Sequence, residues 1–189
     1  MGETGIRRMT VAEFFDWEPG DNGRYELLDG VPVMMVRARR KHDRIVANAI
    51  RSLGNKLDGS RCIPFTADTA VLIPNGNVRL PDAGVDCGRF DGESMHADEP
   101  RLVIEVLSPS TRDSDMSGKL NDYKTVVSLN HIVLVDPDKP WATHWWRAED
   151  RGWRQQGYDG LDAVIKFPDL QIAIGLGELY RGLVFGQRA

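Results

Sequence analysis

The chain contains little cysteine: of its 189 residues only Cys62 and Cys87 are of this type. Their spacing matches no common metal-binding motif, and two cysteines are too few to build a disulfide scaffold. We therefore interpret both as ordinary buried thiols, which agrees with a reducing compartment.

Long apolar runs are also missing. No uninterrupted apolar stretch approaches the ~20 residues that a membrane-spanning helix needs, and the amino-terminal segment MGETGIRRMTVAEFF lacks the apolar core of a signal peptide. We therefore expect a soluble, cytoplasmic protein that does not contact a membrane. A length of 189 residues with 41% hydrophobic residues suits one core better than two, so residues 1–189 are predicted to form a single domain.

The chain has no overall excess of positive charge. Its formal net charge is -4, which argues against a protein that coats nucleic acid through general basicity. One segment is locally basic, and its cationic residues are Arg37, Arg39, Arg40, Lys41 and Arg44. This density could neutralise several phosphates of DNA, or it could be the solvated start of a helix. His42 in the same segment could contact phosphate or transfer a proton, but a surface or helix-packing role is equally compatible.

Three local patterns define the first elements of the predicted fold. Thr10 and Glu13 have the spacing of a capping box, which predicts a short helix after Thr10. The pair Asp29-Gly30 between two strand-like runs predicts a hairpin with a type I′ turn. Apolar residues recur at helical spacing over residues 42–57 and predict one long helix.

The rest of the chain alternates strand-like segments with turns and helices. The elements expected there are strands within 62–74 and 78–87 around a turn at 75–77, a polar loop at 88–99, a buried strand at 102–107, a helix ending near 127, a buried strand at 131–137, a hairpin over 142–160, a short strand within 165–176 and a helix near 178–183. Hairpin and crossover connections together predict an α/β (α+β) fold, with a mixed sheet flanked by helices.

One carboxylate stands inside an apolar strand. Glu105 lies in the segment RLVIEVLSPS, where its neighbours are almost all aliphatic. An ionised carboxylate that is removed from water is costly unless it is paired, hydrogen-bonded or bound to a cation. Another part of the chain must therefore supply a partner for Glu105.

Asp82 is a second carboxylate in a strand-like segment, and it follows Pro81. Proline suits a bend or an irregular edge, so the chain presents Asp82 at such a point. If the strands of Asp82 and Glu105 are neighbours, the two carboxylates can converge on one hard cation, Mg²⁺ or Mn²⁺. Asp68 and Asp86 are further candidate ligands, which strand alternation does not separate from solvent-facing residues.

The helix after Glu105 carries a candidate cation. Asp115, Lys119 and Tyr123 follow one another at intervals of four residues, so they lie close to one helical face. A lysine beside a metal-bound water could orient that water or stabilise the phosphate as negative charge develops on it. The alternative for Lys119 is a solvated pairing with Asp115, and the alternative for Tyr123 is a place in the core.

These motifs resemble those of the Uma-two family of bacterial endonuclease-like proteins, which belongs to the PD-(D/E)XK nuclease superfamily. The matching features are Pro81-Asp82, the segment LVIEVLSPSTRDSD around Glu105, Lys119 and Tyr123. The segments RYELLDGVPVMM and HIVLVDP also stand where that family has such segments, so the resemblance extends over most of the chain. It implies a restriction-endonuclease-like mixed sheet flanked by helices and a Mg²⁺-dependent nuclease that acts on DNA.

The resemblance also implies roles for individual residues. Asp82 and Glu105 would hold the metal, together with the main-chain carbonyl of Val106. Glu26 would be an additional acidic catalytic residue near the site, although a glutamate on a hairpin strand more often faces solvent.

The chain departs from the superfamily signature at one catalytic position. The signature lysine stands two residues after the acid, and this chain has Leu107 there. The Uma-two family shows the same displacement, and its helix lysine corresponds to Lys119. His131 stands where that family usually has a glutamate, so we assign it no role.

Four tryptophans cluster in the predicted hairpin over 142–160 and just before it: Trp141, Trp145, Trp146 and Trp153. Cross-strand aromatic pairs stabilise hairpins without any ligand, and we favour this interpretation over stacking on single-stranded nucleic acid. A subunit interface is a variant of the structural interpretation, so a homodimer stays open.

Three functions fit these observations. The leading one is a Mg²⁺-dependent endonuclease that hydrolyses DNA phosphodiester bonds, in which Lys119 assists the attacking water. Its DNA-binding residues would be Arg39, Arg40, Lys41 and His42. The alternative is a catalytically inactive nuclease-fold module that binds nucleic acid or protein, which Leu107 favours. A hydrolase of small phosphoesters also fits the acidic net charge.

Overall fold

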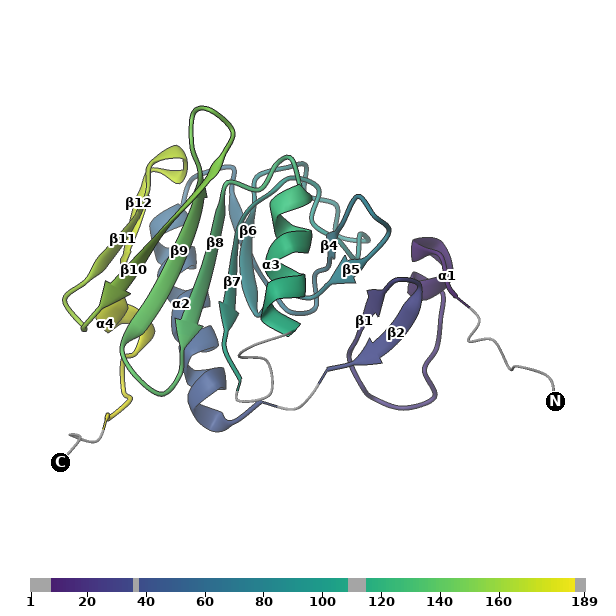
Figure 1. The fold of residues 1–189 in the computed structure, drawn as a ribbon, viewed down its shortest axis with the longest axis horizontal. Coiled ribbons are helices and arrows are strands. Elements are labelled where there is room, and N and C mark those ends of the chain that lie inside the picture. Colours follow the sequence, from purple (N-terminus) through teal and green to yellow (C-terminus); the bar gives the residue numbers. More distant parts are fainter. Residues whose placement is uncertain (1–7, 36–37, 109–114, 186–189) are drawn as a thin grey trace.

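The computed structural model describes residues 8–35, 38–108 and 115–185. Its body is a six-stranded mixed sheet with helices on both faces (Figure 1). In spatial order its strands are β10 (Trp153–Asp159), β9 (Trp141–Arg147), β8 (His131–Asp136), β7 (Pro100–Val106), β6 (Ala83–Asp86) and β3 (Ile63–Thr66). Only β7 and β8 pair in parallel, and the crossover between them contains helix α3 (Asp115–Thr125). The predicted fold class is confirmed.

A smaller four-stranded sheet lies beside the body. Its strands, in spatial order, are β2 (Val31–Met34), β1 (Tyr25–Leu28), β5 (Val78–Arg79) and β4 (Val71–Leu72). Asp29 and Gly30 both have positive φ angles, of 49° and 78°, as a type I′ turn requires, so the predicted hairpin is confirmed.

The predicted capping box is confirmed at helix α1 (Val11–Phe15). The Glu13 N–H donates to Thr10 Oγ1 at 3.2 Å, and the Thr10 N–H donates to Glu13 Oε2 at 2.9 Å. Each side chain therefore satisfies a backbone donor that the first helical turn leaves unpaired.

Helix α2 (Arg40–Leu57) covers one face of the large sheet and begins two residues before the predicted start. Its buried stripe includes Ile45, Ala49 and Leu53, which join the core formed with β6, β7 and β8. The same core contains α4 (Leu176–Leu179) and a hairpin of β11 (Val164–Phe167) and β12 (Ile172–Gly175).

The prediction of one short strand in 165–176 is wrong, because this segment contributes to two strands. The 3-10 turn η1 (Pro168–Leu170) follows β11, and Gln171 adopts a left-handed φ of 57°. These residues reverse the chain so that β12 pairs with β11.

Alternation along β7 determines where Glu105 points. Ile104 and Val106 belong to the core on the α2 face, whereas Val103 belongs to the core on the α3 face. Successive strand residues point to opposite faces, so Glu105 shares the α3 face with Val103. The strand is buried on both faces, as predicted, and Glu105 itself is only 4% exposed.

The two cysteines form a disulfide, so their interpretation as free thiols is wrong. Cys62 directly precedes β3 and Cys87 directly follows β6, and the antiparallel register pairs Ile63 with Asp86. The pairing of these strands therefore brings the cysteines opposite one another, which their spacing in the sequence did not reveal. Within the described residues, no helix is long and apolar enough to cross a membrane.

Close packing over Gly84 on β6 generates a prediction about stability. A Cβ atom at Gly84 would lie 2.2 Å from Cζ of Phe65, so the ring must move if Gly84 is replaced by alanine. We expect Gly84→Ala to lower the free energy of unfolding by about 1–3 kcal/mol in urea denaturation. Gly54 in α2 is the control, since a Cβ there meets nothing within 4 Å. Gly54→Ala should raise stability by up to about 1 kcal/mol, and equal effects of the two changes would contradict the packing.

Candidate active site

A buried lysine lies between two buried glutamates where α3 packs on the sheets. Lys119 Nζ is 2.9 Å from Glu26 Oε1 and 3.3 Å from Glu105 Oε1. All three residues are at most 8% exposed. The alternative of a solvated Lys119 is therefore wrong, and Glu26 does not face solvent as most hairpin glutamates do. The side chain of Asp115, the proposed partner in that alternative, lies outside the described part of the chain.

One face of α3 supplies several of the polar groups. Lys119, Asp122 and Tyr123 follow the i, i+3, i+4 spacing that places side chains on the same helical face. The Tyr123 hydroxyl donates to Glu105 Oε1 at 2.6 Å. Tyr123 is fully buried, so it occupies the core position considered for it and also contacts the candidate site.

Asp82 stands directly before β6 and opposite Glu105. The register pairs Ala83 with Ile104, so continuing it by one residue brings Asp82 across from Glu105. Asp82 Oδ2 accepts the Val106 N–H at 2.8 Å. The structure therefore brings Asp82 and Glu105 to neighbouring strands, close enough that Asp82 contributes to raising the pKa of Glu105.

Histidine at the start of α2 connects the basic segment to this site. His42 Nε2 is 3.1 Å from Asp82 Oδ2. Burial alone would lower the pKa of His42, but hydrogen bonding and attraction to Asp82 raise it above its ordinary value. Figure 1 shows the start of α2 near the carboxyl end of β7 and the start of α3.

The other residues of the basic segment behave differently from one another. Arg39 is the N-cap of α2 and is exposed, as is Arg40. Lys41 is half-buried and forms an ion pair with Asp138. Arg37 lies outside the described residues. The structure thus places Arg39 and Arg40 on the surface beside the site and gives Lys41 a protein partner.

Electrostatics at the centre of the site are unbalanced. Burial raises the pKa of Glu105 to about 7, because desolvation outweighs the attraction of Lys119 and the hydrogen bond from Tyr123. The nearby carboxylates of Asp82 and Glu26 add repulsion. Burial would lower the pKa of Lys119, but Glu105 and Glu26 raise it, so its amine stays protonated. Glu105 therefore has less positive charge around it than a buried carboxylate needs.

Two residues that belong to this network were not predicted from the sequence. Arg79 Nη1 lies 2.9 Å from Glu26 Oε2, and its Nε donates to Asp122 Oδ2 at 2.7 Å. Asp122 shares the face of α3 with Lys119, and this spacing could have identified it. Arg79 stands in the two-residue strand β5 beside buried Val78, and no pattern there signals a buried arginine.

The further candidate ligands lie elsewhere. Asp68 is exposed and lies 3.7 Å from Arg24. Asp86 accepts the backbone N–H groups of Gly88 and Glu99, at 3.1 Å and 2.7 Å, and so organises the loop after β6. Neither carboxylate is part of the network around Lys119.

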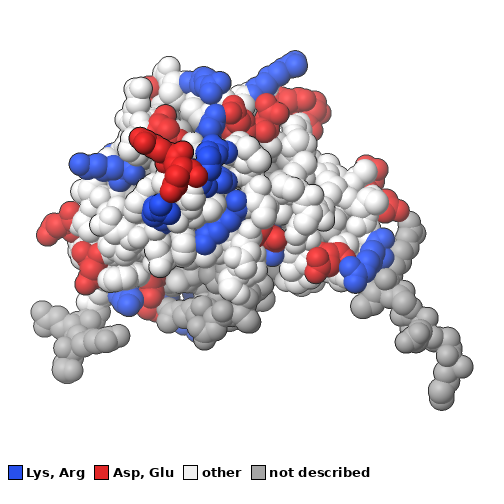
Figure 2. Space-filling view, turned by 45° about the horizontal axis from the view of Figure 1, so that its top comes forward, with Lys and Arg blue, Asp and Glu red and all other residues white. Residues whose placement is uncertain are grey.

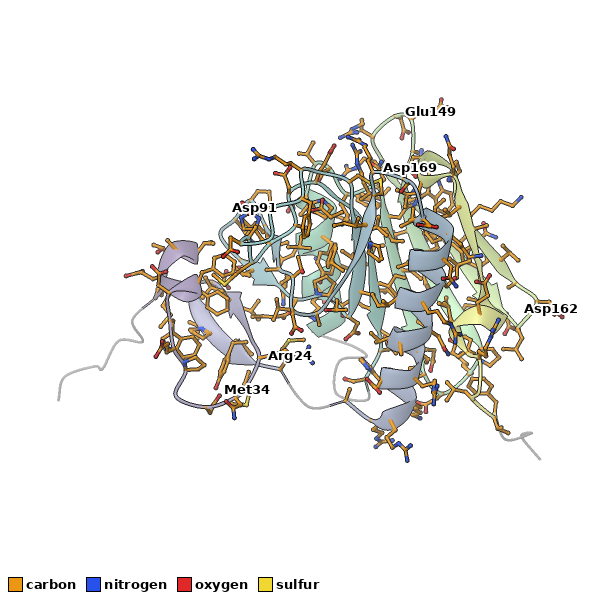
Figure 3. The ribbon with its side chains drawn as sticks, turned by 180° about the vertical axis from the view of Figure 1, so that it is seen from behind. Arg24, Met34, Asp91, Glu149, Asp162 and Asp169 are labelled. Carbon is orange, nitrogen blue, oxygen red and sulfur yellow. A yellow bond between two sulfur atoms is a disulfide. The ribbon has the colours of Figure 1, made fainter. Side chains whose placement is uncertain are left out.

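His131, which received no role, belongs to a different buried cluster. Its Nδ1 is 2.9 Å from His144 Nε2, and its Nε2 is 2.5 Å from Asp169 Oδ1. Figure 3 shows Asp169 near the top of the view, whereas α2 begins at the bottom.

The tryptophans support the structural interpretation of their cluster. Trp153 Nε1 donates to the carbonyl of Lys124 at 3.3 Å, and the Lys124 amine lies 3.4 Å from the ring centroid of Trp145. The hairpin of β9 and β10 is thus fastened to the carboxyl end of α3.

Charges of both signs are mixed on one face of the molecule. Figure 2 brings the top of Figure 1 forward and shows Lys and Arg interspersed with Asp and Glu there, not a uniformly basic face.

Comparisons with known proteins agree with this architecture. The model of the family described as "Putative restriction endonuclease" (Uma2) matches residues 11–176. An uncharacterized protein from Synechocystis sp. is 28% identical over 180 residues, which cover 94% of each chain. A second from the same organism is 26% identical over 168 residues, covering 87% of this chain and 95% of that one.

A solved structure shares the fold. It is the crystal structure of a "putative nuclease belonging to DUF820" from Anabaena variabilis, with a TM-score of 0.73 and 17% sequence identity. The match covers 91% of this chain and 97% of that one.

The raised pKa of Glu105 predicts a pH-dependent stability. Between the ordinary glutamate pKa and about 7, the folded protein holds a proton that the unfolded chain has released, so stability falls as pH rises through this interval. Glu105→Gln removes this contribution. Urea denaturation with EDTA measures the free energy of unfolding at each pH. Between about pH 5 and pH 8 this free energy should fall by about 1–3 kcal/mol less in the variant than in the wild type. If the free energy of unfolding depends on pH in the same way in the variant and the wild type, Glu105 is ionised over the whole interval and the prediction is wrong.

Proposed function

Because the chain belongs to the Uma2 family of restriction-endonuclease-like proteins, we propose that it is a Mg²⁺- or Mn²⁺-dependent endonuclease that hydrolyses DNA phosphodiester bonds. The observation that carries the proposal is a deficit of positive charge around the buried site. Its carboxylates are Glu26, Asp82, Glu105 and Asp122, and its permanent cations are Arg79 and Lys119. While all four carboxylates are ionised, even a protonated His42 leaves negative charge uncompensated, and one divalent cation would offset it.

The donor groups fit a hard cation. Asp82 and Glu105 would be its ligands, because they stand across from one another and offer carboxylate oxygens. The Val106 N–H points to the Asp82 side of β7, and in an extended strand the carbonyl of the same residue points the same way. Among the described residues, no three His, Cys, Asp or Glu side chains form a ready metal cluster. Mg²⁺ tolerates this, since one or two carboxylates suffice when water completes its shell.

The residues of the chain would divide the reaction between them. A cation bound there would polarise the phosphate and promote ionisation of a water molecule. Lys119 is protonated and points at Glu105, so it can donate to the attacking water or to a phosphate oxygen that gains negative charge. The water oxygen would then bond to phosphorus and give up a proton to bulk solvent, while the bond from phosphorus to the leaving sugar oxygen breaks and that oxygen takes a proton from solvent.

Glu26 supports Lys119 and is poorly placed to act as a base. Its Oε1 accepts from Lys119 and from the Leu80 N–H at 3.1 Å, and its Oε2 accepts from Arg79. Both of its oxygens are therefore occupied by donors of the protein itself. We therefore assign Glu26 the task of orienting the Lys119 amine.

The start of α2 would contact the DNA backbone. In support, Arg39 and Arg40 are exposed there, and His42, two residues after Arg40, contacts Asp82. Cationic side chains and a helix amino terminus both attract phosphate.

Cleavage of supercoiled plasmid tests the proposal. The wild type should nick DNA with Mg²⁺ or Mn²⁺ and not with EDTA. Lys119→Ala should lower the rate by about 100-fold or more, because it removes a donor to the charge that develops in the reaction. Lys119→Arg should rescue it only in part, since the guanidinium keeps the charge but changes the geometry.

Lys166→Ala is the matched control, because Lys166 is exposed on β11, and its rate should equal the wild-type rate. Undiminished cleavage by Lys119→Ala would remove Lys119 from the mechanism. A wild type that binds Mn²⁺ but does not cleave would instead favour the inactive binding module.

Metal binding has its own test in thermal melting. Mn²⁺ should raise the melting temperature by several degrees, because an ion that binds only the folded site stabilises it by mass action. The double variant Asp82→Ala, Glu105→Ala should lose this shift. Asp68→Ala is the control, since its carboxylate is exposed and lies outside the network. The same shift in the double variant would place the metal elsewhere.

A further inference from the structure

Arg79 links the small sheet, the site and α3. It ends β5 and stands three residues before Asp82. Its Nη1 lies 2.9 Å from Glu26 Oε2, and its Nη2 and Nε both lie 2.7 Å from Asp122 Oδ2. Although it carries a charge, Arg79 is only 4% exposed.

The Glu26 contact connects Arg79 to the lysine. Arg79 binds one oxygen of Glu26, while the other oxygen receives Lys119 and the Leu80 N–H. A carboxylate group is rigid and planar, so fixing one oxygen also fixes the direction of the other. Arg79 thereby fixes the position of the Glu26 oxygen that contacts the Lys119 amine.

The Asp122 contact connects Arg79 to the helix that carries the lysine. Asp122 lies one turn beyond Lys119 on the same face of α3. Its carboxylate also accepts from Asn77 Nδ2 at 3.0 Å and from Asn75 Nδ2 at 3.3 Å. The turn before β5 and the arginine on β5 therefore hold this turn of α3 against the small sheet.

Only an arginine suits this position. The planar guanidinium presents several donors in a fixed fork and can bind two carboxylates at once, whereas a lysine amine is a single flexible point charge. A buried ion network of this kind contributes little net stability compared with well-packed apolar side chains. Its presence beside Lys119 is therefore better explained by placement than by stability.

We propose that Arg79 is a positioning residue for phosphodiester hydrolysis, holding the Lys119 amine at the metal-bound water through Glu26 and through Asp122 on α3. This inference rests on the proposed nuclease function. It extends the site beyond the groups that would touch metal or DNA.

The test compares Arg79→Lys with Arg147→Lys. Arg147 is the matched control, because it also holds α3 but at the end away from the site, where it donates to the carbonyl of Lys124 at 3.3 Å and to that of Val126, just after the helix, at 3.0 Å. Cleavage is measured in single turnover with Mn²⁺, at a temperature where circular dichroism shows each protein folded. Arg79→Lys should cleave roughly 10–100-fold more slowly, and Arg147→Lys should cleave at the wild-type rate.

Two further readouts separate positioning from general damage. The Mn²⁺-induced rise in melting temperature and the affinity for uncleaved DNA in Ca²⁺ should match the wild type in Arg79→Lys, because neither depends on the Lys119 amine. A folded Arg79→Lys protein with the wild-type rate overturns the proposal. Equal losses of metal binding, DNA affinity and rate also overturn it, since they indicate a collapsed site. Should Arg79→Lys fail to fold, Asp122→Asn is judged by the same criteria.

A wild type that does not cleave would refute the proposed function, and the positioning role is then judged without activity. Arg79→Met, Lys119→Met and the double variant are compared by thermal melting. If Arg79 places Lys119, the fall in melting temperature of the double variant should be smaller than the sum of the two single falls, because both side chains contact Glu26. Strictly additive losses overturn the proposal.

Discussion

The desolvation of Glu105 is the constraint around which the site is built. A carboxylate on the inner face of a central strand cannot be solvated, so the surrounding elements must supply donors and charge. Lys119 and Tyr123 of α3 do so directly, at 3.3 Å and 2.6 Å. The supply is incomplete, and the pKa of Glu105 stays raised, to about 7. A site that is short of one or two positive charges is suited to accept a cation.

The same constraint explains how the two sheets are joined. Lys119 also contacts Glu26 of the small sheet, and Arg79 continues the network to Asp122 on α3. Alternating charges thus run from β7 of the large sheet to β5 of the small one. Each ion has partners of the opposite sign on another element, so displacement of one element would leave buried charges unpaired on the others. The network therefore specifies the relative positions of the sheets and α3.

Burial of polar groups alone does not mark a reactive site, as the second polar cluster illustrates. His131, His144 and Asp169 are linked by short contacts, and Figure 3 shows Asp169 away from the start of α2. Burial lowers the pKa of His144 to about 3, so this imidazole stays neutral and can remain among aromatic neighbours such as Phe167. Burial would raise the pKa of Asp169, but the hydrogen bonds with His131 and Asn130 lower it to about 2, so that cluster keeps the charge of one carboxylate. The site around Glu105 instead gathers several carboxylates beside protonated Lys119 and Arg79. Several carboxylates together would suit a metal better than one.

The sequence by itself determined several helices and strands and showed that Glu105 needs a compensating partner. Periodicity placed α2, turn chemistry placed the Asp29-Gly30 hairpin, and an acid within an apolar run singled out Glu105, because these signals are local along the chain. Only the tertiary structure decided the pairings. The register of β3 with β6 joined Cys62 to Cys87, and the packing of α3 against the small sheet buried Arg79 between Glu26 and Asp122. Such contacts join residues far apart in sequence, and their energies depend on a burial that no single segment encodes.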